Sequence, residues 1–176
     1  DIYNQLVDKY NKAIACVQNN GYTVGKRFYV FLQGEWDVVK GSDATTEQYK
    51  ERFLNMHNGL KRDLGIQFCG LIYSGHLGHD YDSTQASRFT VINNAQKQLV
   101  NENSDIYLAT DITVSMSMDN ESMVDDYHYG TNAYIKIGES AGNNIGSLFS
   151  DRTAPTIQIT SGNGSSSPVK NATVGL

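Results

Sequence analysis

Amphipathic helical stretches alternate with short apolar runs along most of this 176-residue chain. The stretches repeat apolar residues at three- and four-residue steps, and the runs are rich in aromatic and aliphatic residues. Helical periodicity covers residues 1–19, 45–64, 83–100 and 131–148, and the apolar runs cover 27–33, 66–73 and 105–109. This alternation predicts an α/β fold, in which crossover helices connect the strands of a parallel sheet.

Three strands make a narrow sheet, so we expect that N-terminal strand and helix segments of the domain are missing from this chain. The chain begins at Asp1, inside the first amphipathic pattern and without a recognisable signal peptide. We therefore expect Asp1 not to be the natural N-terminus. An exposed apolar sheet edge, or a companion segment that covers it, should mark the place of the missing strand.

The same periodicity predicts which residues face the core. The run 27–33 has no polar alternation, which is typical of a strand buried on both faces. Thr45, followed by Gln48, resembles a capping box, and Gly65 ends that helix. The side chains expected to point inward from the helices include Ile2, Leu6, Val17, Tyr49, Phe53, Ala86, Phe89, Ala95, Leu99, Tyr134, Ile137, Ala141 and Leu148. Lys50 can face water, whereas Cys16 and Cys69 are expected to be small buried hydrophobic residues.

Composition excludes several classes of protein. The net charge is −5, which argues against nucleic acid as the main partner. No run approaches the roughly 18 apolar residues that a membrane-spanning helix needs. Residues 1–150 fit one domain. A segment rich in Gly, Ser and Asn lies within residues 151–176, which we expect to form a linker and a β-like tail that is either an arm or the start of another module.

Polar residues follow the first apolar run, where ligands of parallel sheets gather. Gln33 carries an amide that can donate hydrogen bonds, and Gly34 permits close backbone approach. Glu35 is acidic, and Trp36 could stack on a sugar or belong to the core. The alternative is a simple turn with solvated acids.

The loop at 111–129 holds a second candidate, Asp125 followed by His128. The Asp can accept a hydrogen bond from Nδ1–H, which leaves Nε2 free to remove a proton from a nucleophile. The alternative is a histidine that is merely satisfied within its loop. A weaker candidate is a zinc site at His76 and His79 with the adjacent Asp80, but no further His or Cys cluster completes it. His57 lies near a helix stripe and is expected to be a packing residue or a partly exposed one.

Taken in order, these motifs resemble the sialic-acid-specific acetylesterases, carbohydrate O-acetylesterases of the SGNH (GDSL-like) hydrolases. The resemblance covers about residues 1–148. It rests on Gln33-Gly34-Glu35-Trp36-Asp37, Tyr49, Arg62, Ala95-Gln96, Asp125 to His128, Tyr134, Ile137 and Gly138. The resemblance implies a three-layer α/β/α, flavodoxin-like fold and a Ser-His-Asp hydrolase that needs no metal or organic cofactor.

The resemblance also implies roles for individual residues. His128 would be the general base and Asp125 its orienting acid. Gln33 would sit in the oxyanion hole with Gly34 beside it, and Glu35 would have an orienting or structural role. Trp36 replaces the small residue that is usual there. The family's Gly-x-Ser-Asn-like motif is not found, and we expect its serine on an upstream segment.

The predicted function is removal of acetyl groups from glycans. The alternative is a glycan-binding or structural module of a phage tail or cell-surface protein, with other tail subunits as partners. The expected location is extracellular or in a virion. A metal-dependent hydrolase that uses His76 and His79 is a third possibility.

Overall fold

The computed structural model describes residues 2–40, 45–75, 83–116, 122–125 and 128–149. All seven expected helices and strands are present, close to their expected bounds. The helices are α1 (Ile2–Asn19), α2 (Glu35–Lys40), α3 (Thr46–Leu64), α4 (Ser83–Glu102), the 3₁₀-helix η1 (Ile112–Ser115) and α5 (Thr131–Phe149). The strands are β1 (Phe28–Leu32), β2 (Phe68–Ile72) and β3 (Ile106–Thr110). The short helices α2 and η1 were not expected, and the tail at 151–176 lies outside the described residues.

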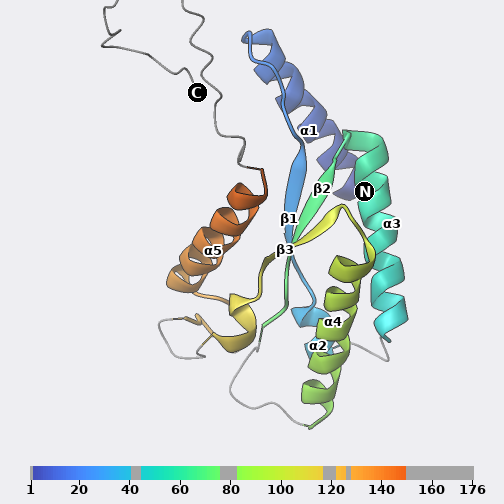
Figure 1. The fold of residues 1–176 in the computed structure, drawn as a ribbon, viewed down its shortest axis with the longest axis vertical. Coiled ribbons are helices and arrows are strands. Elements are labelled where there is room, and N and C mark those ends of the chain that lie inside the picture. The colour runs from blue at the N-terminus through green and yellow to red at the C-terminus, as the bar shows by residue number, and fades with distance from the viewer. Residues whose placement is uncertain (1, 41–44, 76–82, 117–121, 126–127, 150–176) are drawn as a thin grey trace, which may run out of the picture.

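The three strands form a parallel sheet in the order β1-β2-β3, which confirms the α/β prediction. Phe28 pairs with Phe68 and Leu32 with Ile72, so the ends of β1 and β2 are level. Because the strands run the same way, the segments that follow them gather at one end of the sheet, the lower end in Figure 1. Candidate site residues from distant parts of the sequence are therefore brought to a common edge.

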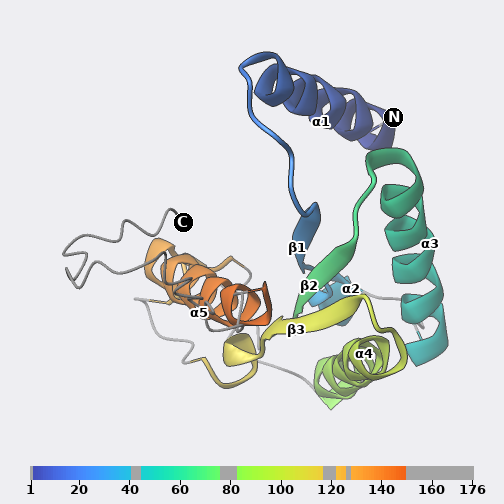
Figure 2. The ribbon, with the colours of Figure 1, turned by 45° about the horizontal axis from the view of Figure 1, so that its top comes forward.

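Helices cover both faces of the sheet and make three layers (Figure 2). Cys69 and Leu71 of β2 are fully buried in a cluster with residues of α2, α3 and α4. Phe68 and Ile72 point to the other face, into a cluster with α5. This period-two alternation is the expected consequence of a strand buried between two helical layers. The expected α/β/α architecture is confirmed.

Strand β1 differs from its prediction. Phe28 and Val30 are 44% and 45% exposed, so the expectation of burial on both faces is wrong. Within the described part of the chain β1 pairs with β2 alone, and its other edge is free. An apolar groove of about 470 Å³ runs beside this edge, and its lining includes Phe28, Val30, Ile145 and Phe149. The predicted exposed apolar edge is therefore present.

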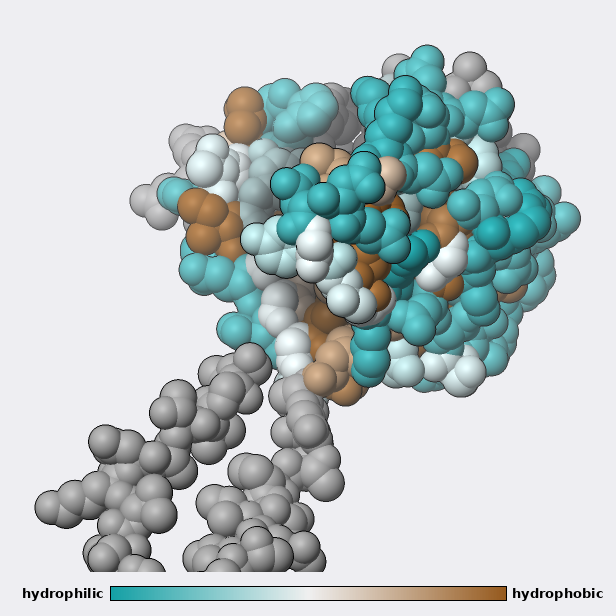
Figure 3. Space-filling model, turned by 90° about the horizontal axis from the view of Figure 1, so that it is seen from above, coloured by the Kyte–Doolittle hydropathy of each residue, from teal (hydrophilic) through white to brown (hydrophobic). Residues whose placement is uncertain are grey.

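On several helices the apolar stripe is wider than the protein surface that packs against it, so some of its residues are exposed. Tyr134 and Leu148 of α5 are 53% and 44% exposed, and Ala86 is also exposed, so their inward assignment is wrong. Helix α1 packs against α3 and buries none of its residues completely. The inward assignment of Ile2, Leu6 and Val17 and the expected burial of Cys16 are therefore also wrong, since all four are exposed. Cys69 is buried as predicted. Seen from above, hydrophobic residues appear in several separate patches among the hydrophilic ones (Figure 3).

No helix in the described ranges combines the length and the apolar character that crossing a membrane requires.

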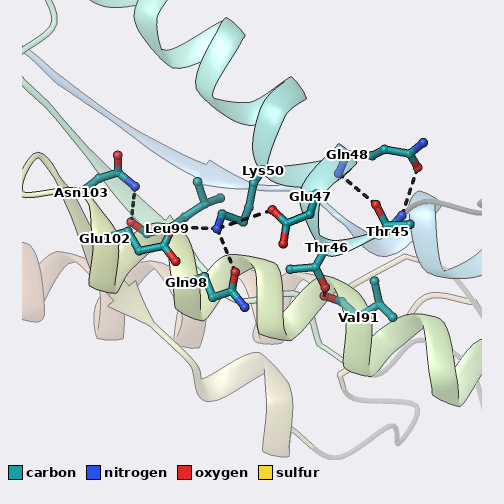
Figure 4. A network of polar contacts seen from close by, with 10 residues as sticks. All are labelled: Thr45, Thr46, Glu47, Gln48, Lys50, Val91, Gln98, Leu99, Glu102 and Asn103. Carbon is teal, nitrogen blue, oxygen red and sulfur yellow. Dashed lines mark hydrogen bonds and ion pairs between the residues drawn. The ribbon is translucent and has the colours of Figure 1, made fainter.

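Polar contacts fasten α3 to α4 (Figure 4). Lys50 Nζ lies 2.7 Å from Glu102 Oε2 and 2.8 Å from Gln98 Oε1, and the Lys50 side chain is only 13% exposed. The expectation that Lys50 faces water is therefore wrong, because these two partners of α4 draw it into the interface. The predicted capping box is present: Thr45 Oγ1 accepts from the Gln48 backbone N–H at 3.2 Å, and Gln48 Oε1 accepts from the Thr45 N–H.

Replacing Lys50 should cost more stability than replacing an exposed lysine with a similar ion pair. We expect Lys50→Ala to lower the free energy of unfolding by about 1–2 kcal/mol, because a charge-assisted contact between two helices is lost. Lys12→Ala is the control, since Lys12 pairs with Asp8 at 2.7 Å but is 75% exposed. It should change stability by less than about 0.5 kcal/mol. Urea denaturation measures both free energies, and equal losses would show that the contacts of Lys50 with α4 add no stability.

Candidate active site

The turn after β1 is fixed by three hydrogen bonds to one backbone carbonyl. The carbonyl oxygen of Gln33 accepts from the Tyr49 hydroxyl at 2.8 Å, from Ser74 Oγ at 3.0 Å and from Gln96 Nε2 at 3.0 Å. These donors come from α3, the end of β2 and α4. Since Ser74 and Gln96 are completely buried, the position of the turn is determined by the interior of the protein.

Gln96 organises this cluster. Its Oε1 accepts from the Ser74 backbone N–H at 2.8 Å, and its Nε2 also lies 3.0 Å from Ser74 Oγ and 3.2 Å from the Tyr49 hydroxyl. In the sequence, Ala95-Gln96 and Tyr49 stand out only as points of resemblance to the family, and the cluster itself was not predicted. A polar residue on the inward face of an otherwise amphipathic helix was the available signal, because a buried amide needs partners.

Gly34 is required where it stands. Its φ is +142°, and an added Cβ would lie 2.2 Å from Ser74 Oγ and 2.8 Å from Ile92 Cγ2. Backbone conformation and space therefore both exclude a side chain. The expectation of close backbone approach at Gly34 is confirmed, although what approaches is the protein's own core.

The Gln33 side chain donates to Asp37 Oδ2 at 2.6 Å. An amide nitrogen carries two hydrogens, so one remains available for another acceptor. Gln33 and Asp37 line a cavity of about 240 Å³ together with Tyr49 and Arg52. Trp36 on α2 is 64% exposed, which rules out the core role that the sequence left open for it.

Asp125 and His128 are in direct contact. His128 Nδ1 lies 2.9 Å and 2.8 Å from the two carboxylate oxygens of Asp125, and the His128 backbone N–H donates to Oδ1 at 2.8 Å. A carboxylate at Nδ1 favours the tautomer with the proton on that atom, which leaves the lone pair on Nε2. The two side chains are 72% and 51% exposed, so the imidazole is accessible from solvent.

The segments on either side of this pair, residues 122–124 and 129–130, are joined to each other by backbone hydrogen bonds. Val124 N–H donates to the His128 carbonyl at 2.9 Å, and Gly130 N–H donates to the Ser122 carbonyl at 2.7 Å. Met123 and Tyr129 form an antiparallel bridge between these bonds. Met123 is 8% and Tyr129 is 6% exposed. The exposed Asp125–His128 pair is therefore supported by the buried bridge between Met123 and Tyr129.

The two candidate loops meet at Glu35. The Tyr129 hydroxyl lies 3.5 Å from Glu35 Oε1, so the residue after His128 contacts the turn that follows β1. Burial raises the pKa of the Glu35 carboxyl, while hydrogen bonds from backbone N–H groups, including that of Gly75, and from Tyr129 oppose the rise. Sequence reasoning did not identify Gly75 or Tyr129.

Of the three other histidines, the structure describes His57, whereas His76 and His79 lie outside the described residues. His57 is 1% exposed and bonds the Tyr29 hydroxyl at 2.9 Å through Nδ1 and Asp105 at 3.2 Å through Nε2, so its expected packing role is confirmed. The proposed zinc residues His76, His79 and Asp80 lie outside the described residues. Across the ranges that the structure does cover, no group of three or more His, Cys, Asp or Glu could hold a metal ion.

Comparison with known proteins gives one family match. The family model described as carbohydrate esterase, sialic acid-specific acetylesterase, matches residues 1–146, which include β1, the Gln33 turn and the Asp125–His128 pair. Neither the curated proteins nor the solved structures provide a match to the chain.

A side chain at position 34 should damage the fold because it meets buried atoms. We expect Gly34→Ala to lower the free energy of unfolding by about 3 kcal/mol or more, from the unfavourable φ and the overlap with Ser74 together. Gly21→Ala is the matched control: its φ is +83°, but an added Cβ would meet nothing within 4 Å. It should cost only about 1–2 kcal/mol. Denaturant titration measures the free energy of unfolding of both variants. Equal losses would show that the overlap of the added Cβ with Ser74 Oγ does not contribute.

Proposed function

The chain belongs to the sialic acid-specific acetylesterase family of carbohydrate esterases, and on that premise we propose that it removes acetyl groups from glycans by acyl transfer through a serine, with His128 as the general base. The observation that carries the proposal is the contact of both Asp125 carboxylate oxygens with His128 Nδ1. That contact leaves Nε2 as the basic nitrogen, the arrangement that activates a hydroxyl in hydrolases of this chemistry.

The reaction has two steps. In the first, the serine oxygen attacks the acetyl carbonyl while His128 Nε2 accepts the hydroxyl proton, and His128 then returns the proton to the leaving sugar oxygen. In the second, water attacks the acyl-enzyme with the same assistance and releases acetate. Asp125 stabilises the imidazolium that forms in each step.

Gln33 is the proposed side-chain donor to the oxyanion. Asp37 holds its Nε2 at 2.6 Å, which restrains the amide and leaves its second hydrogen available. The backbone carbonyl of Gln33 accepts from three buried donors. Because its backbone is held in this way, the Gln33 side-chain amide needs little rearrangement during the reaction. Loss of such a donor typically costs about 3 kcal/mol of transition-state stabilisation. Trp36 is the proposed contact for the sugar, because its ring is exposed on α2 beside this turn.

The nucleophile is proposed to come from a segment outside this chain, either of the same polypeptide or of a neighbouring subunit. Ser74 is unsuitable because it is completely buried and its hydroxyl donates to the Gln33 carbonyl. The free edge of β1 supports the proposal, since a further strand there would end beside the Gln33 turn. The apolar groove along that edge provides a surface for such a segment.

A non-catalytic glycan-binding module is the second candidate. It is favoured by one observation: in the part of the chain that the structure describes, no serine hydroxyl is bonded to His128 Nε2. Labelling of the complete protein with a fluorophosphonate probe, which reacts with activated serines, distinguishes the two functions. We expect one serine to be labelled, and labelling to depend on His128. Glycan binding without labelling would support the binding module.

The two described histidines allow a matched test of the catalytic proposal, because both contact an aspartate but only His57 is buried. In the complete protein, His128→Ala should reduce hydrolysis of an aryl acetate by about 1,000-fold or more with an unchanged melting temperature. His57→Ala should instead lower the melting temperature and leave kcat per folded molecule nearly unchanged. Hydrolysis that survives His128→Ala would refute the assignment of the general base.

A further inference from the structure

Three segments that follow different strands converge on the Glu35 carboxylate. Glu35 itself lies just after β1, at the start of α2. The Gly75 backbone N–H, after β2, donates to its carboxylate. The Tyr129 hydroxyl, beyond β3 and η1, approaches Oε1 at 3.5 Å. One half-buried acidic side chain thus contacts Gly75, which follows β2, and Tyr129, which lies beyond β3.

Gly75 shows how closely these loops approach. An added Cβ at Gly75 would lie 2.6 Å from the Tyr129 hydroxyl oxygen and 2.3 Å from the Thr113 carbonyl oxygen. The absence of a side chain at position 75 is therefore what allows Tyr129 to reach Glu35. Tyr129 is 6% exposed, and its ring packs edge-on against Tyr134 at 5.7 Å, so its hydroxyl is held in a defined place.

The Asp125–His128 pair needs such support. Both side chains are largely exposed, at 72% for His128 and 51% for Asp125, so the packing of the core does not enclose the imidazole. The neighbours Met123 and Tyr129 join this turn to the core, because both belong to the buried cluster that packs against α5. Because Tyr129 directly follows His128, a fixed Tyr129 hydroxyl restrains the His128 backbone.

We propose that Glu35 and Tyr129 form a positioning pair that holds the Asp125–His128 turn against the loop that follows β1. The inference rests on the proposed function, because the pair is proposed to position the general base His128 beside the Gln33 turn. Glu35 is a positioning residue and not a catalytic one: it acts through Tyr129. A carboxylate suits the role because its two oxygens can accept from Gly75 and Tyr129 at once. At 3.5 Å the Tyr129 contact is a long hydrogen bond.

The test uses Glu35→Gln, Tyr129→Phe and the double variant in the complete protein. Each single variant should lower kcat for an aryl acetate about 10- to 100-fold with little change in KM, because a misplaced base slows the chemical step. The double variant should lose about as much as the worse single variant, since the two residues form one contact. Losses that multiply would show that the residues act independently and would overturn the proposal.

A second measurement does not depend on activity. Amide hydrogen exchange at Val124, His128 and Gly130 reports whether the turn is held, since these N–H groups donate within it. We expect about tenfold faster exchange in both single variants. Glu51→Gln, at an exposed position of α3, is the matched control and should change neither exchange nor kcat. Unchanged exchange and unchanged kcat in Glu35→Gln would overturn the positioning role.

These readouts separate the inference from the function on which it rests. A complete protein that shows no hydrolysis but faster exchange in both variants would refute the esterase proposal and retain the positioning pair. Unfolding is distinguished by the melting temperature. Since burial raises the pKa of Glu35, its ionised form opposes folding at neutral pH, and Glu35→Gln should leave the melting temperature unchanged or raise it.

Discussion

The carbonyl oxygen of Gln33 is the point on which the rest of the site depends. It accepts hydrogen bonds from donors on α3, β2 and α4, and so ties the turn after β1 to three separate elements. The donors are buried, where an unmatched polar group would be costly, so the cluster has little freedom to rearrange. Gly34 is a consequence, because a side chain there would occupy the volume of the Ser74 hydroxyl. A rigid turn of this kind can present side chains to a ligand with little loss of entropy on binding.

His57 and His128 show that the same pairing can serve different purposes. Each imidazole contacts an aspartate, yet His57 is enclosed by Tyr29, Phe53 and Asp105, whereas His128 is open to solvent. Burial makes the first histidine part of the packing, and exposure makes the second available for proton transfer. The difference comes from the element that carries each residue: His57 lies on the inner face of α3 and His128 follows a turn.

The sequence predicts the fold well where side chains repeat regularly. Periodicity placed the long helices and the three strands, because each must bury one face. It missed α2, which is six residues long and too short to show a period. It also assigned Tyr134 and Leu148 to the core, since the pattern reveals an apolar stripe but not the width of the surface that covers it. The contact between Asp125 and His128 was predictable from their spacing. The roles of Gln96, Gly75 and Tyr129 were not, because their partners lie far away in the sequence and are set by how the loops pack.

The unequal burial of the two cysteines has a practical consequence. Cys16 is exposed on α1, whereas Cys69 is completely buried in the middle strand of the sheet, where burial raises the pKa of its thiol to about 12. An alkylating reagent can therefore modify Cys16 in the native protein, while Cys69 reacts only after β2 has separated from its neighbours. Alkylation of Cys69 therefore reports opening of the sheet, and alkylation of Cys16 on α1 serves as the reference for the labelling reaction.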